Sequence, residues 1–168
     1  AFCDRTPSAG SARLLPRLDR FGTATEGSIA ELRDHARFTA DISRLSRQPF
    51  AGLFLDYGHE APALGDTLQA VSRHAYADPL ADPGRADLTA HVDFASLAEA
   101  LVAAGLAVEP LLAQGEFLGR LGIIERARAL ARRNPLEANA VEMAVARLVS
   151  PAAMGQRFKV LAVRGRDL

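Results

Sequence analysis

Apolar residues recur every three to four positions in four stretches of the chain, as they do along one face of an α-helix. These stretches span residues 28–47, 94–104, 117–132 and 137–149. Ser28 followed by Glu31 has the form of a capping box, and Asp93 stands where the second helix needs an N-cap. The pattern therefore predicts four helices, two of them with a recognisable N-terminus.

Short apolar or alternating runs lie between the helical stretches and predict strands. They occupy residues 50–55, 87–94, 106–112 and 158–163. The first is a continuous apolar run, which is typical of a strand buried in a parallel sheet, whereas 87–94 alternates strictly between apolar and polar residues. Alternating strands and helices predict an α/β fold, and we expect parallel strands near 52–56, 106–112 and 158–163.

Two further segments have weaker patterns. Asp66 followed three residues later by Gln69 resembles a second capping box and predicts a short helix through about Arg73. His74 would then close that helix, where a positive charge suits the helix dipole. Residues 1–27 are rich in Pro, Gly, Ser and Thr and have no steady period, so we expect a loop or a poorly ordered segment there.

Composition excludes several classes of protein. Twenty basic and twenty acidic residues give a formal net charge of zero, which argues against nucleic acid or an anionic membrane surface as a partner. No stretch approaches the roughly 18 apolar residues of a membrane span. Cys3 is the only cysteine, so an internal disulfide and a thiolate zinc cluster are excluded, and we expect a reducing, intracellular environment. The sequence does not begin with Met, and we expect its front part to be missing.

Five motifs follow one another in a fixed order: LFLDYGHE at 53–60, DTLQAVSRH at 66–74, PGRADLTAHVDFASL at 83–97, QGEFLGRLGI at 114–123 and RLVSPAAMGQRFKVLAV at 147–163. Together they resemble the C-terminal half of the MidA-like methyltransferases, relatives of the mitochondrial arginine methyltransferase that acts in complex I assembly. The resemblance is good over 52–163 and loose over 25–51. It implies the C-terminal half of a Rossmann-like class I methyltransferase sheet with flanking helices, formed by residues 28–168.

The resemblance also implies a function. It predicts a fragment of an S-adenosyl-L-methionine-dependent methyltransferase, a protein arginine N-methyltransferase, whose partner is a protein substrate such as a subunit of respiratory complex I. The cytoplasm of a bacterium is the expected location, with the mitochondrial matrix as the alternative. Without its front half, the strand at 52–56 would present an unpaired apolar edge, through which the chain could associate with itself.

One departure from the family pattern favours a different function for the isolated chain. Rossmann-like enzymes carry a Gly-rich turn after the first strand, where the backbone approaches the cofactor. No GxGxxG-like turn occurs in this sequence, so no cofactor-binding residue can be assigned. The alternative is a non-catalytic binding or assembly module, inactive as an isolated chain. A metal-dependent hydrolase built on Asp87, His91 and Asp93 is a remote third possibility.

Candidate site residues stand at the ends of the predicted strands, where open α/β sheets bind their ligands. Carboxylates suit a guanidinium substrate, because its five donors match their oxygens, and a histidine could shuttle a proton. Turn formation for Asp56, an N-cap for Asp93 and a structural role for His91 remain open alternatives. The predicted catalytic residues are Asp56, Tyr57, His59, Asp87, His91 and Glu116, and the predicted substrate-binding residues are Asp93 and Gln114.

Overall fold

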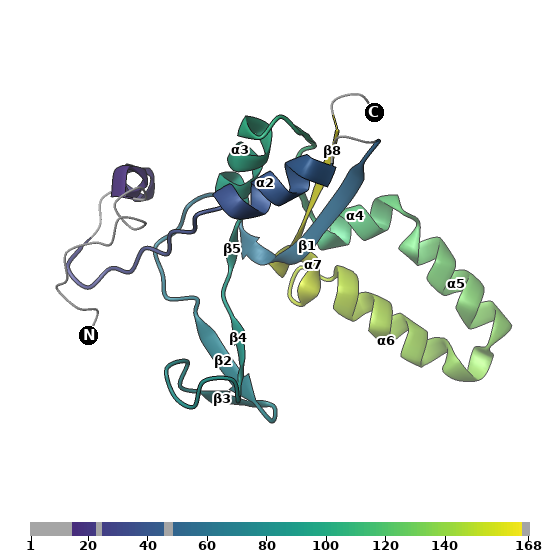
Figure 1. The fold of residues 1–168 in the computed structure, drawn as a ribbon. Helices are drawn as coiled ribbons and strands as arrows, with labels where there is room; N and C mark the ends of the chain where they lie inside the picture. Colours follow the sequence, from purple (N-terminus) through teal and green to yellow (C-terminus); the bar gives the residue numbers. More distant parts are fainter. Residues whose placement is uncertain (1–14, 23–24, 46–48, 166–168) are drawn as a thin grey trace.

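The computed structural model describes residues 15–22, 25–45 and 49–165, which form a mixed sheet with helices and a second, smaller sheet (Figure 1). In chain order the elements are η1 (Leu15–Phe21), α2 (Ala36–Leu45), β1 (Ala51–His59), β2 (Gln69–Ser72), β3 (Ala75–Ala77), β4 (Asp87–Thr89), β5 (Val92–Asp93), α3 (Phe94–Ala103), β6 (Ala107–Val108), β7 (Leu112–Ala113), α4 (Gln114–Arg120), α5 (Ile123–Arg133), η2 (Pro135–Glu137), α6 (Ala138–Val149), α7 (Met154–Arg157) and β8 (Phe158–Arg164). The predicted α/β class is confirmed.

The main sheet has the strand order β5–β1–β8–β6, and β7 also pairs with β8. Its longest ladder joins β1 to β8 in antiparallel register, from Ala51 opposite Arg164 to Tyr57 opposite Phe158. On its other side β1 pairs only with β5, in parallel, at its last two residues. The outer edge of β1 therefore has no strand partner over residues 51–57 in the part of the chain that is described.

The predicted parallel arrangement of the apolar runs is wrong, because β8 is antiparallel to β1, β6 and β7. An apolar run predicts a strand but carries no information about its direction. The expected burial of the first run is also wrong, because no residue of β1 is buried. Between β7 and β8 the helices α4 to α7 lead the chain out and back (Figure 1). β8 therefore enters the sheet at the end where β7 left it, which makes the two strands antiparallel.

The core lies between the main sheet and α3, whose predicted boundaries are confirmed. Asp93 caps this helix, because its side chain accepts a hydrogen bond from the Ser96 backbone N–H at 2.9 Å. The N-cap role, one of the two roles considered for Asp93 from the sequence, is therefore confirmed. α2 packs on the same side of the sheet, where Phe38 meets Phe54 edge to face at 5.5 Å. The buried core residues are Phe94, Leu97, Leu101, Leu106, Leu161 and Val163.

The predicted short helix at 66–73 is wrong, because this segment leads into strand β2. β2 pairs with β3 and β4 in a second sheet of order β3–β2–β4, which lies beyond the end of the main sheet (Figure 1). His74 is therefore not at a helix terminus. It forms the tight turn between β2 and β3 with Arg73, both with positive φ (65° and 51°), as hairpin turns of this length require.

Four other predicted boundaries differ. The strand expected at 87–94 is two strands, β4 in the second sheet and β5 in the main sheet. The helix expected from Ser28 begins only at Ala36, and its proposed capping residue Glu31 instead binds backbone N–H groups 36 and 37 residues away. The strand expected at 106–112 is split into β6 and β7 around Pro110, which lacks an N–H for a ladder. The helix expected at 117–132 is two helices, separated at Gly122 with φ 80°. Of residues 1–27, the segment 1–14 lies outside the described residues, and Leu15–Phe21 forms a 3₁₀ helix.

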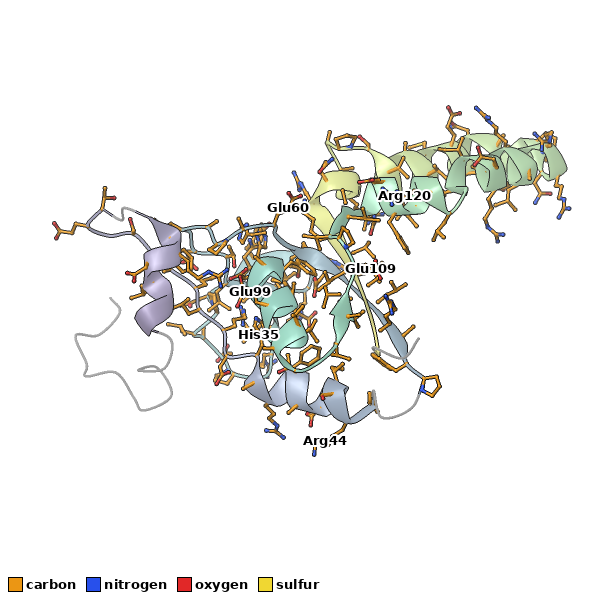
Figure 2. The ribbon with its side chains drawn as sticks, turned by 90° about the horizontal axis from the view of Figure 1, so that it is seen from above. His35, Arg44, Glu60, Glu99, Glu109 and Arg120 are labelled. Atoms are coloured by element: carbon orange, nitrogen blue, oxygen red, sulfur yellow. The ribbon has the colours of Figure 1, made fainter. Side chains whose placement is uncertain are left out.

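Helices α5 and α6 form a hairpin that extends away from the sheet, with Arg120 close to its base (Figures 1 and 2). The predicted helix at 137–149 is confirmed by α6. No residue of α5 or α6 is buried, because the two helices cover each other on one side only. The hairpin is therefore an appendage, and the stability of the fold rests on α3 and the β1–β8 ladder.

We predict that Leu161→Ala will reduce the free energy of unfolding by about 2–5 kcal/mol, because it leaves a cavity beneath α3. Leu161 is 1% exposed, whereas Leu136 in the hairpin is 100% exposed and provides a matched control. Leu136→Ala should change the free energy by less than about 0.5 kcal/mol. Urea denaturation followed by circular dichroism measures both, and equal effects would contradict this description of the core.

Candidate active site

A pocket of about 640 Å³ lies between the end of β1 and the second sheet. The main sheet contributes residues from the end of β1 and the start of β8, and the second sheet contributes residues from all three of its strands. The lining consists of Tyr57, Gly58, His59, Thr67, Gln69, Val71, Tyr76, Thr89, His91, Arg157 and Phe158. The predicted site residues Tyr57, His59 and His91 are thus brought together.

Two histidines from distant parts of the chain meet at this pocket. His59 Nε2 lies 3.3 Å from His91 Nδ1, and the two ring centroids are 4.9 Å apart. Tyr57 meets the His91 ring edge to face at 5.6 Å and the Phe158 ring at 5.3 Å. One histidine nitrogen must donate and the other accept in the contact between them, so the pair can hold a single shared proton.

Gly58 makes this meeting possible. A Cβ built at Gly58 would lie 2.1 Å from the backbone oxygen of Val92, which is far inside van der Waals contact. Only a residue without a side chain therefore lets β1 approach β5 at this point. Because His59 follows Gly58 and His91 precedes Val92, the close approach of the two strands places both imidazoles side by side.

The environment keeps His91 neutral. Burial lowers the pKa of His91 below its ordinary 6.5, and the neighbouring His59 lowers it further. The carboxylates of Glu31 and Asp56 act in the opposite direction without reversing the shift. A neutral imidazole at pH 7 can accept a proton, which is the property a general base needs.

The predicted carboxylates do not line the pocket. Asp56 is exposed within β1, opposite Lys159 of β8, and its side chain accepts a hydrogen bond from the Tyr57 backbone N–H at 2.8 Å. Because Asp56 lies in a strand, the turn-forming alternative is wrong. Asp87 is exposed at the start of β4, and Glu116 forms an ion pair with Arg120 one helical turn away at 2.6 Å. The structure therefore does not bring these three to the histidine pair on one concave surface.

The two predicted substrate-binding residues have local structural contacts. Asp93 caps α3, although it also lines a small cleft beside His59 and His91. Gln114 is buried at 7% exposure, and its Nε2 donates to the Leu148 carbonyl at 2.9 Å, which ties α4 to α6. The role of Gln114 in the described structure is the attachment of the hairpin.

Several pocket residues were not predicted. Arg157, Gln69, Tyr76 and Thr89 line the pocket although no sequence signal distinguished them from other polar or aromatic residues. An acidic residue in the segment before α2, Glu31, lines the small cleft together with both histidines. The sequence pattern predicts only a capping role for Glu31, because its partners Thr67 and Leu68 are too far along the chain to appear in a local pattern.

Neither a metal nor a membrane span is supported by the described residues. Asp87, His91 and Asp93 do not form a group that could hold a metal ion, nor do any other three described His, Cys, Asp or Glu residues. The metal-dependent hydrolase therefore has no structural support. In the same part of the chain, no helix has the length and apolar character needed to cross a membrane.

The described residues do not fit an S-adenosyl-L-methionine cradle. Such a cradle needs a strand that runs through a Gly-rich turn into a helix. Gly105 and Gly122, which have positive φ, follow helices rather than strands. Gly58, the glycine near the end of β1, faces the backbone of Val92, and the next element after β1 is strand β2 and not a helix.

Comparison with solved structures defines the class of protein. The chain superimposes on a protein from Burkholderia thailandensis, described as a "likely methyl transferase" and bound to S-adenosyl-homocysteine, with a TM-score of 0.72 and 28% identity over 98% of this chain and 43% of that chain. A second Burkholderia thailandensis structure, of an uncharacterized protein, gives a TM-score of 0.74 at 29% identity and covers 98% of this chain and 45% of that one. The fold is therefore that of an S-adenosyl-L-methionine-dependent methyltransferase.

Residues 3–111 match the model of a family described as "Putative S-adenosyl-L-methionine-dependent methyltransferase", and the chain belongs to this family. Among curated proteins it is 36% identical to the mitochondrial protein arginine methyltransferase NDUFAF7 homolog of Drosophila melanogaster, over 71% of this chain and 28% of the relative. Human NDUFAF7 is 31% identical over 79% of this chain and 32% of its own length. The chain thus spans about a third of these relatives, and the predicted family resemblance is confirmed.

We predict that His91→Gln will make stability less dependent on pH below 6.5. Because the folded pKa of His91 is lowered, the unfolded chain binds more protons between that pKa and 6.5, so stability is lost as the pH falls through this window. The His91→Gln variant has no ionisable side chain at this position, so it should not lose stability in this way. Urea denaturation at several pH values from 7 to 5 checks it, with His74→Gln in the exposed turn as control. If the free energy of unfolding depends on pH in the same way in the wild type and in His91→Gln, the lowered pKa of His91 is refuted.

Proposed function

We propose that the whole protein is a protein arginine N-methyltransferase, and that this chain supplies the part of its active site that receives the substrate. Residues 28–168 would form the C-terminal part of the methyltransferase domain. The single observation that carries the proposal is the His59–His91 contact of 3.3 Å at the wall of a 640 Å³ pocket beyond the end of β1. The family and the names of its relatives support the type of reaction.

The chemistry of the pocket suits one half of a methyl transfer. A guanidinium nitrogen that gains a methyl group must lose a proton, and the histidine pair is placed to accept it. Guanidinium groups stack on aromatic rings, and Tyr57, Tyr76 and Phe158 line the same pocket. Positioning of the nitrogen against the histidines would provide most of the rate enhancement from this side of the site.

The charge balance of the pocket indicates what else the site needs. Its lining within the described residues includes Arg157 and no carboxylate. A second guanidinium beside Arg157 is unfavourable until a carboxylate offsets the charge. We therefore infer that carboxylates holding the substrate come from another part of the full protein. S-adenosyl-L-methionine, the methyl donor of the family, would also be bound by that other part.

Partner and location are inferred from the relatives. Their names as protein arginine methyltransferases support a protein substrate, and their mitochondrial names support the mitochondrial matrix, which was the alternative to a bacterial cytoplasm. A subunit of respiratory complex I as the substrate stays a proposal drawn from the family resemblance.

The non-catalytic alternative applies to the 168-residue chain alone. The outer edge of β1 has no partner over 51–57 within the described residues, and Leu53 and Leu55 on this strand are 52% and 47% exposed. Unpaired apolar edges recruit further strands. We therefore propose that the isolated chain associates with itself or with another protein through β1, and that in the full protein another strand covers this edge.

We predict that the 168-residue chain neither binds S-adenosyl-L-methionine tightly nor stays monomeric. The sequence contains no GxGxxG turn, and among the residues that the structure describes no strand pairs with the outer edge of β1 over 51–57. A chain extended upstream to the length of the relatives should bind the cofactor and be monodisperse. Calorimetric titration and light scattering on both chains measure this. Micromolar binding by the shorter chain would show that it holds a complete cofactor site.

We predict that His59→Ala and His91→Ala in the full-length protein will each lower kcat for methylation of an arginine peptide by roughly a hundredfold or more, because the proton acceptor is lost. His74→Ala, in the exposed turn between β2 and β3, is the matched control and should retain wild-type activity. Transfer of a radiolabelled methyl group to the peptide measures the rate. Full activity of both histidine variants would refute the proposed role.

A further inference from the structure

The carboxylate of Glu31 accepts several hydrogen bonds close to the histidine pair. Glu31, in the segment before α2, accepts hydrogen bonds from the backbone N–H groups of Thr67 at 2.9 Å and Leu68 at 3.1 Å. Its second oxygen accepts a hydrogen bond from the Thr67 hydroxyl. Three donors from one short segment thus converge on a single side chain that is distant in sequence, which fixes the position of residues 67 and 68.

Thr67 passes this constraint to the active site. Its Oγ1 accepts a hydrogen bond from the His91 backbone N–H at 2.9 Å, while its proton is directed to Glu31. The hydroxyl therefore acts as donor and acceptor at once, which a threonine or serine can do and a valine cannot. The chain of contacts runs from Glu31 through Thr67 to the backbone of His91, and from the His91 ring to His59.

The same contacts hold both connections between the two sheets. Thr67 lies two residues before β2, where the chain enters the second sheet, and His91 lies between β4 and β5, where the chain returns. The second sheet forms one wall of the pocket. Glu31 and Thr67 therefore fasten the base of that wall at the point where the histidines meet.

We propose that Glu31 is a positioning residue of the active site, which sets the contact between His91 and His59 through Thr67. Its catalytic meaning rests on the proposed function, whereas its effect on the histidines does not. Neither Glu31 nor Thr67 belongs to the residues that the sequence pattern assigned to the site. Both line clefts that also contain His59 and His91.

The electrostatics agree with an ionised Glu31. Burial alone would raise the pKa of Glu31, but the hydrogen bonds from Thr67 and Leu68 and the charge of Arg33 outweigh it, so the pKa lies below 4.5. The titratable and charged groups around His91 are His59, Glu31, Asp56, Asp93, Arg33 and Arg157. The negative charge of Glu31 favours the protonated form of His91.

The test uses four variants of this chain. Glu31→Gln keeps the size and removes the charge, and Thr67→Val removes the hydroxyl link. Thr67→Ser restores that link, and Glu26→Gln removes one negative charge from an exposed position in the same segment. NMR titration of the histidine rings follows His91 and His59 without any need for activity, and urea denaturation establishes that each variant is folded.

We expect Glu31→Gln to move the titration of His91 to lower pH, because the anion that favours its protonated form is lost. Thr67→Val should change the ring resonances of both histidines, whereas Thr67→Ser and Glu26→Gln should reproduce the wild type. In the full-length protein, Glu31→Gln and Thr67→Val should lower kcat roughly tenfold to a hundredfold, with KM within about twofold and a shifted pH profile.

The outcomes separate this proposal from the proposed function. Histidine titrations and resonances that match the wild type in both Glu31→Gln and Thr67→Val would overturn the positioning role, whatever the activity. The same result from Glu26→Gln as from Glu31→Gln would also overturn it, because the effect would then be one of general charge. Altered titrations in a full-length protein that transfers no methyl group would uphold the positioning role and refute the proposed function instead.

Discussion

The antiparallel ladder between β1 and β8 is the constraint on which the other elements depend. It joins residues 51–57 to residues 158–164, so that the second sheet, α3 and the helical hairpin all lie within one loop that this ladder closes. Closing a long loop costs conformational entropy before any contact compensates for it. The compensation comes from α3, which packs Phe94, Leu97 and Leu101 on Leu161 and Val163 of β8.

The candidate site lies where this ladder ends and β1 changes its partner. After Tyr57 the strand leaves β8 and approaches β5, and Gly58 is the residue that allows the two backbones to come so close. The Tyr-Gly-His sequence at 57–59 therefore serves both the fold and the chemistry. The tyrosine packs on Phe158, the glycine admits β5, and His59 meets His91 as a result.

Local pattern was sufficient to predict the elements that depend on local contacts. The core face and Asp93 cap of α3, the run of β8 and the helix α6 follow from spacing and capping alone. The direction of β8 depends on the path of four intervening helices, and the second sheet depends on pairing between β2 and β4, which no short window contains. The sequence pattern therefore indicated a class of fold but not the order and direction of its strands.

The site was predictable to the same limited degree. Tyr57, His59 and His91 could be found because strand ends collect ligand-binding residues, whereas Asp56, Asp87 and Glu116 satisfied the same rule and lie elsewhere. Adjacent residues on a strand point to opposite faces, so the rule cannot separate Asp56 from Tyr57. Glu31 was missed because its partners lie more than thirty residues away, at Thr67 and Leu68.

The long sequence separation between β1 and β8 has a consequence for folding during translation. Roughly a hundred residues must be translated after β1 before its main partner exists, which takes about 5–20 s at ordinary rates of synthesis. During that time the edge of β1 that later pairs with β8 has no strand partner over residues 51–57. Nascent chains of this protein therefore carry an aggregation-prone strand that chaperones would have to shield until translation reaches Phe158.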